Sequence, residues 1–411
     1  MHFHIEPNTQ TPAYMQLYQL LRRAIETGIY PAGTHLPSKR LLAEESGVSV
    51  ITVEHTYSIL CDEGYIEARP RSGYYVIYLR TDFPTNRNGA SPHPKTPSAV
   101  QPVTLGAVSG ICADGSSQHA LQMEDEILQD PVIQDAASAS ASTDSPLPFP
   151  MLARTMRRIL TEYGEKILIK SPNHGCSELR RAIADYLNRS FSIGKTIHPK
   201  QIIIGSGAEY LYSLIVQLFR AWIPGGAPIF ALESPSYEKI RQVYEANGVV
   251  CDLLQLGKDG IQSDALAKTN AQILHITPFH SYPSGITADA SKRREYLDWA
   301  DKRGGYLIED NYDSELTIST KNEDTVFSLA ENGNVLYLNT FSHTVAPSIR
   351  VGYLLLPPLL LPVFEKHLGF YSCTVPVFEQ YVLAELLNSG EFERHINRVR
   401  RARRAQRAEQ K

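Results

Sequence analysis

The sequence lacks any hydrophobic run long enough to cross a membrane. Its longest apolar stretches, residues 211–219 and the proline-interrupted residues 353–364, fall short of the roughly 18 to 20 residues that a spanning helix needs. The amino terminus also lacks the positively charged and apolar regions of a secretory signal. We therefore expect no membrane association and a location in the cytoplasm.

Cysteine is scarce and the charges nearly balance. The 40 Lys and Arg against 44 Asp and Glu give a net charge of −4, which alone argues for neither nucleic acid nor membrane as a partner. The five cysteines form no CxxC pair and no Cys/His cluster, so we expect reduced thiols in the core and no metal site. They are Cys61, Cys112, Cys176, Cys251 and Cys373.

Changes in composition divide the 411 residues into five segments. Residues 1–80 form an ordered opening, 81–102 a linker rich in Pro, Asn, Ser and Thr, and 103–147 a poorly defined connecting segment. In residues 148–393, amphipathic stretches alternate with short apolar runs, which predicts an α/β sheet covered by helices. Residues 394–411 are rich in arginine and are interpreted as a solvated helix end or as a basic arm near phosphates.

The first eighty residues have the spacing of a helix-turn-helix followed by a hairpin. A helix that starts after Thr11 ends near Gly28, and Ser38 and Ser49 are placed to cap a second and a third helix. Residues 65–68 and 74–78 then flank an arginine-containing turn, which predicts a β-hairpin, or wing. A small interaction domain of three helices and a hairpin fits the same pattern.

Polar residues of this segment are suited to DNA. The start of the third helix would offer hydroxyls and amides to a groove, while basic side chains would meet phosphates. The DNA-binding candidates are Ser38, Lys39, Arg40, Ser49, Thr52, Arg69, Arg71 and Gly73.

Residues 36–76, LPSKRLLAEESGVSVITVEHTYSILCDEGYIEARPRSGYYV, resemble the winged helix-turn-helix domain of the GntR family of bacterial regulators. The resemblance spans most of residues 11–78 and implies binding to a double-stranded DNA operator. GntR proteins usually carry an arginine directly after the serine of the turn, where this chain has Val50. One expected DNA contact is therefore missing.

In the second half of the chain, polar residues follow predicted strands at their carboxyl ends, where open α/β sheets hold ligands. A Gly-Ser-Gly turn follows the strand at 201–204 and precedes a helix at 208–222, whose first amides could bind phosphate. The strand at 306–308 delivers Asp310 and Tyr312, and the strand at 335–339 delivers Thr340, Ser342 and Arg350.

Each of these clusters has a structural alternative. The glycines could serve only a tight turn, Asp310 could cap a helix, Arg350 could pair on the surface, and Tyr237 of the ESPSY segment could belong to the core.

In this order, the motifs resemble the fold type I pyridoxal phosphate enzymes, whose large domain is the aspartate aminotransferase-like α/β fold. The closest resemblance is to the MocR subfamily, which joins a GntR-type winged helix to such a body; it covers residue 149 to the end. It implies that Asp310 pairs with the pyridinium nitrogen, Tyr237 stacks on the ring and Tyr312 hydrogen-bonds the phenolic oxygen near His280. The phosphate would be held by Ser206, Gly207, Ala208, Thr340, Ser342 and Arg350.

The sequence departs from this family at the residue that carries the chemistry. The Schiff-base lysine that follows the TFS motif is His343 here, and an imidazole cannot form that bond. No catalytic residue is then intact, and we expect no ordinary transamination. Longer relatives add a small domain with a substrate-binding arginine after the basic helix, whereas this sequence stops at Lys411, so we also expect substrate capture to differ.

These observations favour a DNA-binding transcriptional regulator. Its aminotransferase-like body would form a homodimer and sense a small-molecule effector, either an amine or a ligand related to pyridoxal phosphate that is bound without a covalent link. Two alternatives stay open. The body could be a pyridoxal phosphate-dependent enzyme with His343 as acid or base, or a scaffold that only dimerises the winged helix.

Overall fold

The computed structural model describes residues 5–6, 11–69, 72–78, 147–191, 196–223, 225–317 and 324–409. The linker at 81–102 lies outside these residues, as do the connecting segment apart from Leu147, Arg71 of the wing and Cys112. Within the described ranges, no helix is both long enough and apolar enough to cross a bilayer.

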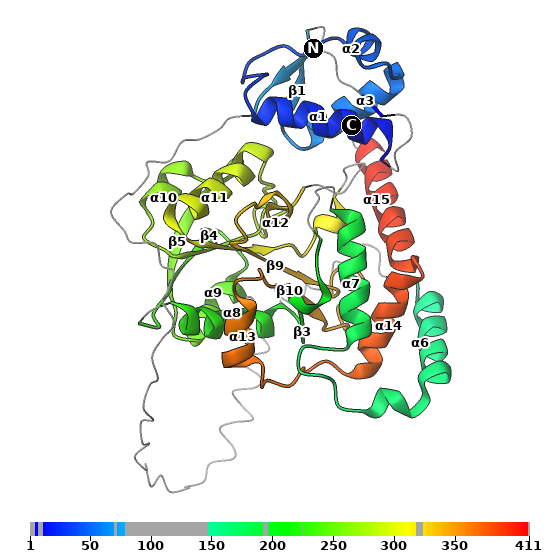
Figure 1. Ribbon diagram of the computed structural model, residues 1–411, viewed down its shortest axis with the longest axis vertical. Coiled ribbons are helices and arrows are strands. Elements are labelled where there is room, and N and C mark those ends of the chain that lie inside the picture. The colour runs from blue at the N-terminus through cyan, green and yellow to red at the C-terminus, as the bar shows by residue number, and fades with distance from the viewer. Residues whose placement is uncertain are drawn as a thin grey trace, which may run out of the picture. The chain divides into compact units, whose positions relative to one another are not determined.

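The amino-terminal residues form the expected winged helix-turn-helix. Three helices, α1 (Ala13–Glu26), α2 (Lys39–Ser46) and α3 (Val50–Asp62), precede the antiparallel strands β1 (Ile66–Arg69) and β2 (Gly73–Val76) (Figure 1). Gly47, with a φ of 67°, supplies the left-handed residue that ends α2, and the Ser49 hydroxyl then accepts a hydrogen bond from the Thr52 amide at 3.1 Å to start α3. The Ser38 hydroxyl accepts a hydrogen bond from the Leu41 amide at 3.3 Å at the start of α2, so both predicted caps, Ser38 and Ser49, form.

The rest of the described chain is built around a sheet of eight strands. Their order is β3-β10-β9-β8-β7-β4-β5-β6, and all neighbouring strands from β9 to β5 are parallel. β10 runs antiparallel to both β3 and β9, and β6 antiparallel to β5. The strands are β3 (Ile202–Gly205), β4 (Ile229–Ser234), β5 (Val250–Gly257), β6 (Gly260–Ile261), β7 (Ile273–Ile276), β8 (Tyr306–Asp310), β9 (Val335–Thr340) and β10 (Gly352–Leu355).

Helices cover both faces of this sheet (Figure 1). On one face lie α8 (Ala208–Trp222), α9 (Glu238–Ala246) and α13 (Leu361–Leu368). On the other lie α7 (Ser177–Ser190), α11 (Ala290–Arg303), α12 (Val326–Leu329), α14 (Val377–Asn388) and α15 (Glu391–Glu409). The remaining elements are α6 (Phe149–Tyr163), α10 (Ser263–Lys268) and the short 3₁₀ turns Gly164–Leu168, Pro199–Gln201 and Ser314–Leu316.

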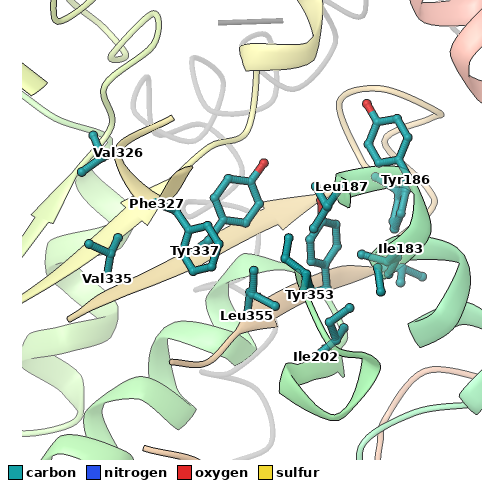
Figure 2. Packing of buried hydrophobic residues seen from close by; sticks show 14 of the residues in the cluster. Ile183, Tyr186, Leu187, Ile202, Val326, Phe327, Val335, Tyr337, Tyr353 and Leu355 are labelled. Atoms are coloured by element: carbon teal, nitrogen blue, oxygen red, sulfur yellow. The ribbon is translucent and has the colours of Figure 1, made fainter. Parts of the chain in front are cut away.

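Alternation along the strands divides the core between the two faces. In β9, Leu336 and Leu338 pack with α8, whereas Val335 and Tyr337 pack on the opposite face. Figure 2 shows Tyr337 close to residues of β10 and α7 on that face. The central strands β8, β9 and β10 are buried on both sides, as in a sheet between two helical layers, and the predicted α/β class is confirmed.

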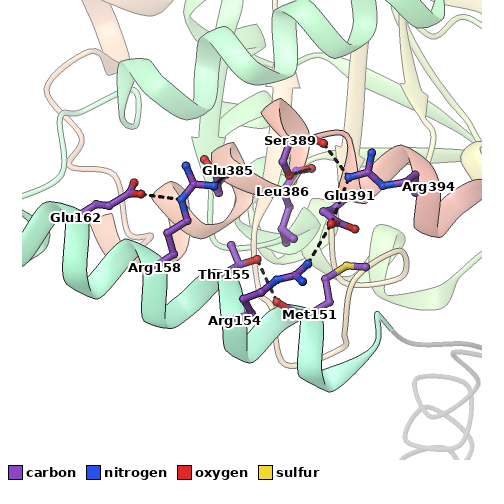
Figure 3. Close-up of polar contacts among 10 residues, drawn as sticks. All are labelled: Met151, Arg154, Thr155, Arg158, Glu162, Glu385, Leu386, Ser389, Glu391 and Arg394. Atoms are coloured by element: carbon purple, nitrogen blue, oxygen red, sulfur yellow. Dashed lines mark hydrogen bonds and ion pairs between the residues drawn. The ribbon is translucent and has the colours of Figure 1, made fainter.

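Helix α6 is attached to α14 and α15 by exposed ion pairs (Figure 3). Arg158 lies 2.6 Å from Glu385, and Arg154 lies 3.1 Å from Glu391. Because such exposed pairs contribute under about 1 kcal/mol, the attachment depends mainly on apolar contacts such as that of buried Ile159.

Three sequence-based expectations differ from the structure. The boundary at 393/394 falls inside α15, because the helix is continuous and buries Ile396 and Val399 in the core of the body. The apolar runs did not reveal β4, β5 or β10. Of the described cysteines, only Cys176 is buried; Cys61, Cys251 and Cys373 are half-buried, so the expectation of core thiols holds for one of these four.

Candidate functional site

Strand direction brings the predicted cofactor residues to one edge of the sheet. Because β10 is antiparallel to both neighbours, β3 and β9 end where β10 begins, and Gly352 lies opposite both Gly205 and Thr340. β8 is parallel to β9 and ends at the same edge with Asp310. Residues that are up to 146 positions apart in the sequence, from Ser206 to Gly352, therefore share this edge.

The expected phosphate residues meet where α8 begins. Gly207 has a φ of 84°, and a Cβ at this position would lie 3.0 Å from the Arg350 guanidinium. Only glycine combines that conformation with so close an approach. Ala208 is the first residue of α8, and the Ser342 hydroxyl donates to the Ile349 carbonyl at 2.8 Å, which fixes the loop that carries Arg350.

Asp310 is buried and keeps one oxygen for another partner. Its Oδ2 accepts a hydrogen bond from the Tyr212 hydroxyl and lies 3.6 Å from Nε2 of His275, whose Nδ1 is 2.7 Å from the Tyr244 hydroxyl. Its Oδ1 has no hydrogen-bond partner among the described residues. A buried carboxylate oxygen in this state is suited to a positively charged N–H donor.

Tyr312 and His343 lie beside a second buried carboxylate, Asp313. The Tyr312 hydroxyl donates to the His280 carbonyl at 2.6 Å, and burial raises the pKa of Tyr312, which keeps the phenol protonated. Nδ1 of His343 lies 3.3 Å from Oδ1 of Asp313, while Nδ1 of His280 lies 2.7 Å from Oδ2. Arg403 of α15 reaches the same Oδ2 at 3.7 Å. Asp313 thus lies within ion-pair distance of two imidazoles and a guanidinium, one of them His343 at the position of the expected lysine.

Tyr237 lies at the start of α9 and is half-buried. Its ring is edge-on to Tyr282 at 6.1 Å, and Tyr282 belongs to the same HSYPSG segment as His280. The ring is thus near the loop that contacts Tyr312.

Three buried glutamates hold the loops around this edge. Burial raises the pKa of Glu233, Glu309 and Glu315 to about 7 in each case. Glu233 accepts from the Ser281 hydroxyl at 2.6 Å, and Glu309 accepts from the Phe327 amide at 2.7 Å. Glu233 thus fixes the loop that follows β7, and Glu309 fixes the start of α12.

The DNA-binding candidates occupy two parts of the winged helix. The Ser38 and Ser49 hydroxyls act as helix caps, and Ser49 also contacts the Thr52 hydroxyl at 2.8 Å. Lys39 pairs with Glu54 at 2.6 Å, and Arg40 is exposed on α2.

In the wing, Arg69 stacks on Tyr75 at 4.5 Å and lies 3.2 Å from Glu67. Gly73 has a φ of 102°, and a Cβ there would meet the His35 ring at 2.5 Å, so the hairpin requires glycine. Arg71 lies outside the described residues.

Sequence reasoning missed four residues of this edge: Tyr212, His275, Asp313 and Arg403. Tyr212 is 98 positions from Asp310, and only the packing of α8 on the sheet brings the two together. Asp313 could have been suspected, since it directly follows the Asp310–Tyr312 segment. Among the residues that the structure describes, no cluster of three or more His, Cys, Asp or Glu could hold a metal ion.

Two family models match the chain. Residues 13–76 match "Bacterial regulatory proteins, gntR family", and residues 140–410 match "Aminotransferase class I and II".

Similar curated proteins align with nearly the whole of this chain. The uncharacterized HTH-type transcriptional regulator YdeL of Bacillus subtilis is 30% identical over 95% of this chain and 76% of its own length. The probable rhizopine catabolism regulatory protein MocR of Rhizobium meliloti is 27% identical over 97% of this chain and 76% of its own. The HTH-type pyridoxine biosynthesis transcriptional regulator PdxR of Corynebacterium glutamicum is 28% identical over 97% of this chain and 78% of its own.

Solved aminotransferases share the fold of the body. The kynurenine aminotransferase of Pyrococcus horikoshii gives a TM-score of 0.57 at 22% identity, over 70% of this chain and 73% of that one. An archaeal alanine:glyoxylate aminotransferase gives a TM-score of 0.54 at 22% identity, over 61% of this chain and 62% of that one. At such identities the likeness shows the fold alone.

Replacement of Glu315 by glutamine should flatten the pH dependence of stability. The pKa of this carboxyl is raised from roughly 4.3 in the unfolded chain to about 7 when folded. Its neutral form therefore favours the folded state at low pH, and this contribution is lost as the pH rises through about 7. The free energy of unfolding of wild type should fall by up to about 3 kcal/mol between about pH 5 and 8 because of this group. Glu315→Gln should lack this loss, because glutamine stays neutral and can still accept from Asn339.

Urea unfolding at several pH values measures this difference. Glu162→Gln, which changes an exposed glutamate of α6, should keep the wild-type slope. If the stability of wild type and of Glu315→Gln depends on pH with the same slope, the raised pKa of Glu315 in the folded state is contradicted.

Proposed function

The chain belongs to the GntR-type HTH transcriptional regulators with an aminotransferase class I and II domain, and we propose that this domain senses pyridoxal phosphate or a related ligand without a covalent bond. The observation that carries the proposal is Oδ1 of buried Asp310, which has no hydrogen-bond partner in the described part of the chain and lies at the same sheet edge as the Gly207–Arg350 approach. These features support an acceptor for a ring N–H and a basic cradle for a phosphate.

The proposed contacts follow the residues at this edge. Asp310 would accept from the ring nitrogen and keep a proton there, Tyr312 would donate to the phenolic oxygen, and Tyr237 would stack on the ring. The phosphate would be held by Ser206, Gly207, Ala208, Thr340, Ser342 and Arg350. When bound, pyridoxal phosphate supplies an aldehyde that reacts with amines and a ring that withdraws electrons.

His343 decides how the ligand would be held. An imidazole has no primary amine, so it cannot provide the covalent link, and ordinary transamination is not expected. The imidazole instead lies beside Asp313, with 3.3 Å between His343 Nδ1 and Asp313 Oδ1, and beside the Tyr312 ring, 5.6 Å away. Binding would therefore be reversible, as a sensor of ligand concentration requires.

The body would also pair two DNA-reading domains. Two-fold operators are read by recognition helices from both subunits of a dimer, so we propose a homodimer that acts on DNA in the cytoplasm. A dimer mass in sedimentation experiments would support this arrangement, and a monomer mass would contradict it.

A second candidate function is a pyridoxal phosphate-dependent enzyme in which His343 acts as acid or base. The Asp313–His343 contact favours it, because a buried carboxylate can orient an imidazole for proton transfer. Consumption of an amino compound by the reconstituted protein would support this function.

Pyridoxal phosphate should bind wild type reversibly and His343→Lys covalently. We expect the cofactor's absorbance to be retained by wild type in equilibrium dialysis but lost after borohydride treatment and denaturation. His343→Lys should keep a reduced chromophore. Asp310→Asn should weaken binding about 10- to 100-fold, because it removes a charged hydrogen-bond acceptor.

The control for this experiment is Asp301→Asn, which alters an exposed carboxylate on α11 and should bind like wild type. Absence of bound chromophore in both wild type and His343→Lys would contradict the proposed cofactor site.

Arg40→Ala and Arg69→Ala should weaken DNA binding almost equally for all sequences. Phosphate contacts supply sequence-independent affinity, so each variant should also reduce the dependence of log K on log salt by about 1. Fluorescence anisotropy with a labelled duplex at several salt concentrations measures both effects. Arg154→Ala, at an exposed ion pair of the body, is the matched control; if it reduces the slope as much, Arg40 and Arg69 are not phosphate contacts.

A further inference from the structure

The first turn of α3 exposes two large apolar side chains. Val50 is 42% and Ile51 78% exposed, whereas Val53, Tyr57 and Leu60 of the same helix are fully buried. An exposed isoleucine contributes nothing to the core of this domain, and its apolar surface is available to a partner.

The polar groups around these two residues are already engaged. The Ser49 hydroxyl accepts from the Thr52 amide and contacts the Thr52 hydroxyl. Glu54, one turn after Val50, pairs with Lys39. The start of this helix therefore presents an apolar surface flanked by paired polar groups.

Where a helix-turn-helix binds DNA, the first residues of its recognition helix, which is α3 in this chain, contact base edges in the major groove. The apolar group that the major groove offers is the C5-methyl of thymine. We infer that Val50 and Ile51 read thymine methyl groups, so that operator specificity is carried by apolar contacts at these positions. This inference rests on the proposed contact of the winged helix with DNA.

The geometry of a helix adds a further expectation. Consecutive residues point about 100° apart around the helix axis, so Val50 and Ile51 would contact methyl groups of different base pairs. Each half-site should then contain thymine at two nearby positions.

The test begins with duplexes selected from a random pool by the full-length protein. Each thymidine of a selected duplex is then replaced by deoxyuridine, which removes only the methyl group. Wild type should lose about three- to fivefold in affinity at one or two positions of each half-site, the effect of one buried methyl. Ile51→Ala should bind thymine and uracil equally at one of these positions, and Val50→Ala at the other.

Two controls separate specificity from folding. Ile29→Ala removes an isoleucine that is 52% exposed outside α3 and should keep the full preference for thymine. Ile51→Val, which retains part of the contact, should show an intermediate preference.

The outcomes distinguish this inference from the function on which it rests. Tight binding to selected duplexes with no loss on uracil substitution, or with the same loss in Ile51→Ala, would overturn the inference alone. If no duplex is selected at all, DNA binding by this chain is contradicted, and the inference fails with it.

Discussion

The direction of β10 is the constraint on which the candidate site depends. Because this strand runs antiparallel between β3 and β9, the loops that follow β3 and β9 and the loop that precedes β10 meet at one edge. The same register sets Gly205, Gly352 and Thr340 side by side. Next to them, the backbone of Gly207 closely approaches the Arg350 guanidinium. A parallel β10 would carry Arg350 to the opposite edge and dismantle the cradle.

In the proposed function, this edge keeps the residues that would bind the ligand, and His343 replaces the residue that would link it covalently. Asp310 is buried with an oxygen left for a donor, and Tyr312 is held protonated near His343. His343 lies beside Asp313, which also contacts His280 and Arg403. Under the proposed function, such a site would bind and release its ligand, and its fusion to a winged helix would give the binding a regulatory use.

The sequence predicted local elements well where one pattern dominated. The helix at 208–222 coincides with α8, because a Gly-Ser-Gly turn precedes a long run of apolar residues at helical spacing. β5 escaped prediction because it is only partly buried and alternates irregularly, and β10 because it runs directly into Pro357 within one apolar stretch. Contacts set by topology, such as Tyr212 with Asp310, leave no signal in the local sequence.

The order of residues along the chain predicted which of them would share one edge of the sheet, but it could not predict the environment of each side chain there. The carboxylate partner of His343 and the reach of Arg403 from α15 follow from how the last helix packs on the body. The arginine-rich segment looked solvated because its apolar residues are few, yet Ile396 and Val399 are buried in the core of the body and Arg400 donates to the Glu315 carbonyl.

The central claim is that a ligand in the aminotransferase-like body controls the DNA-reading winged helix. The most direct measurement is the affinity of the full-length protein for a selected operator duplex, with and without saturating pyridoxal phosphate. Pyridoxal phosphate should change this affinity by at least about fivefold in wild type and leave it unchanged in Asp310→Asn. An unchanged operator affinity in wild type that demonstrably holds the ligand would contradict the central claim.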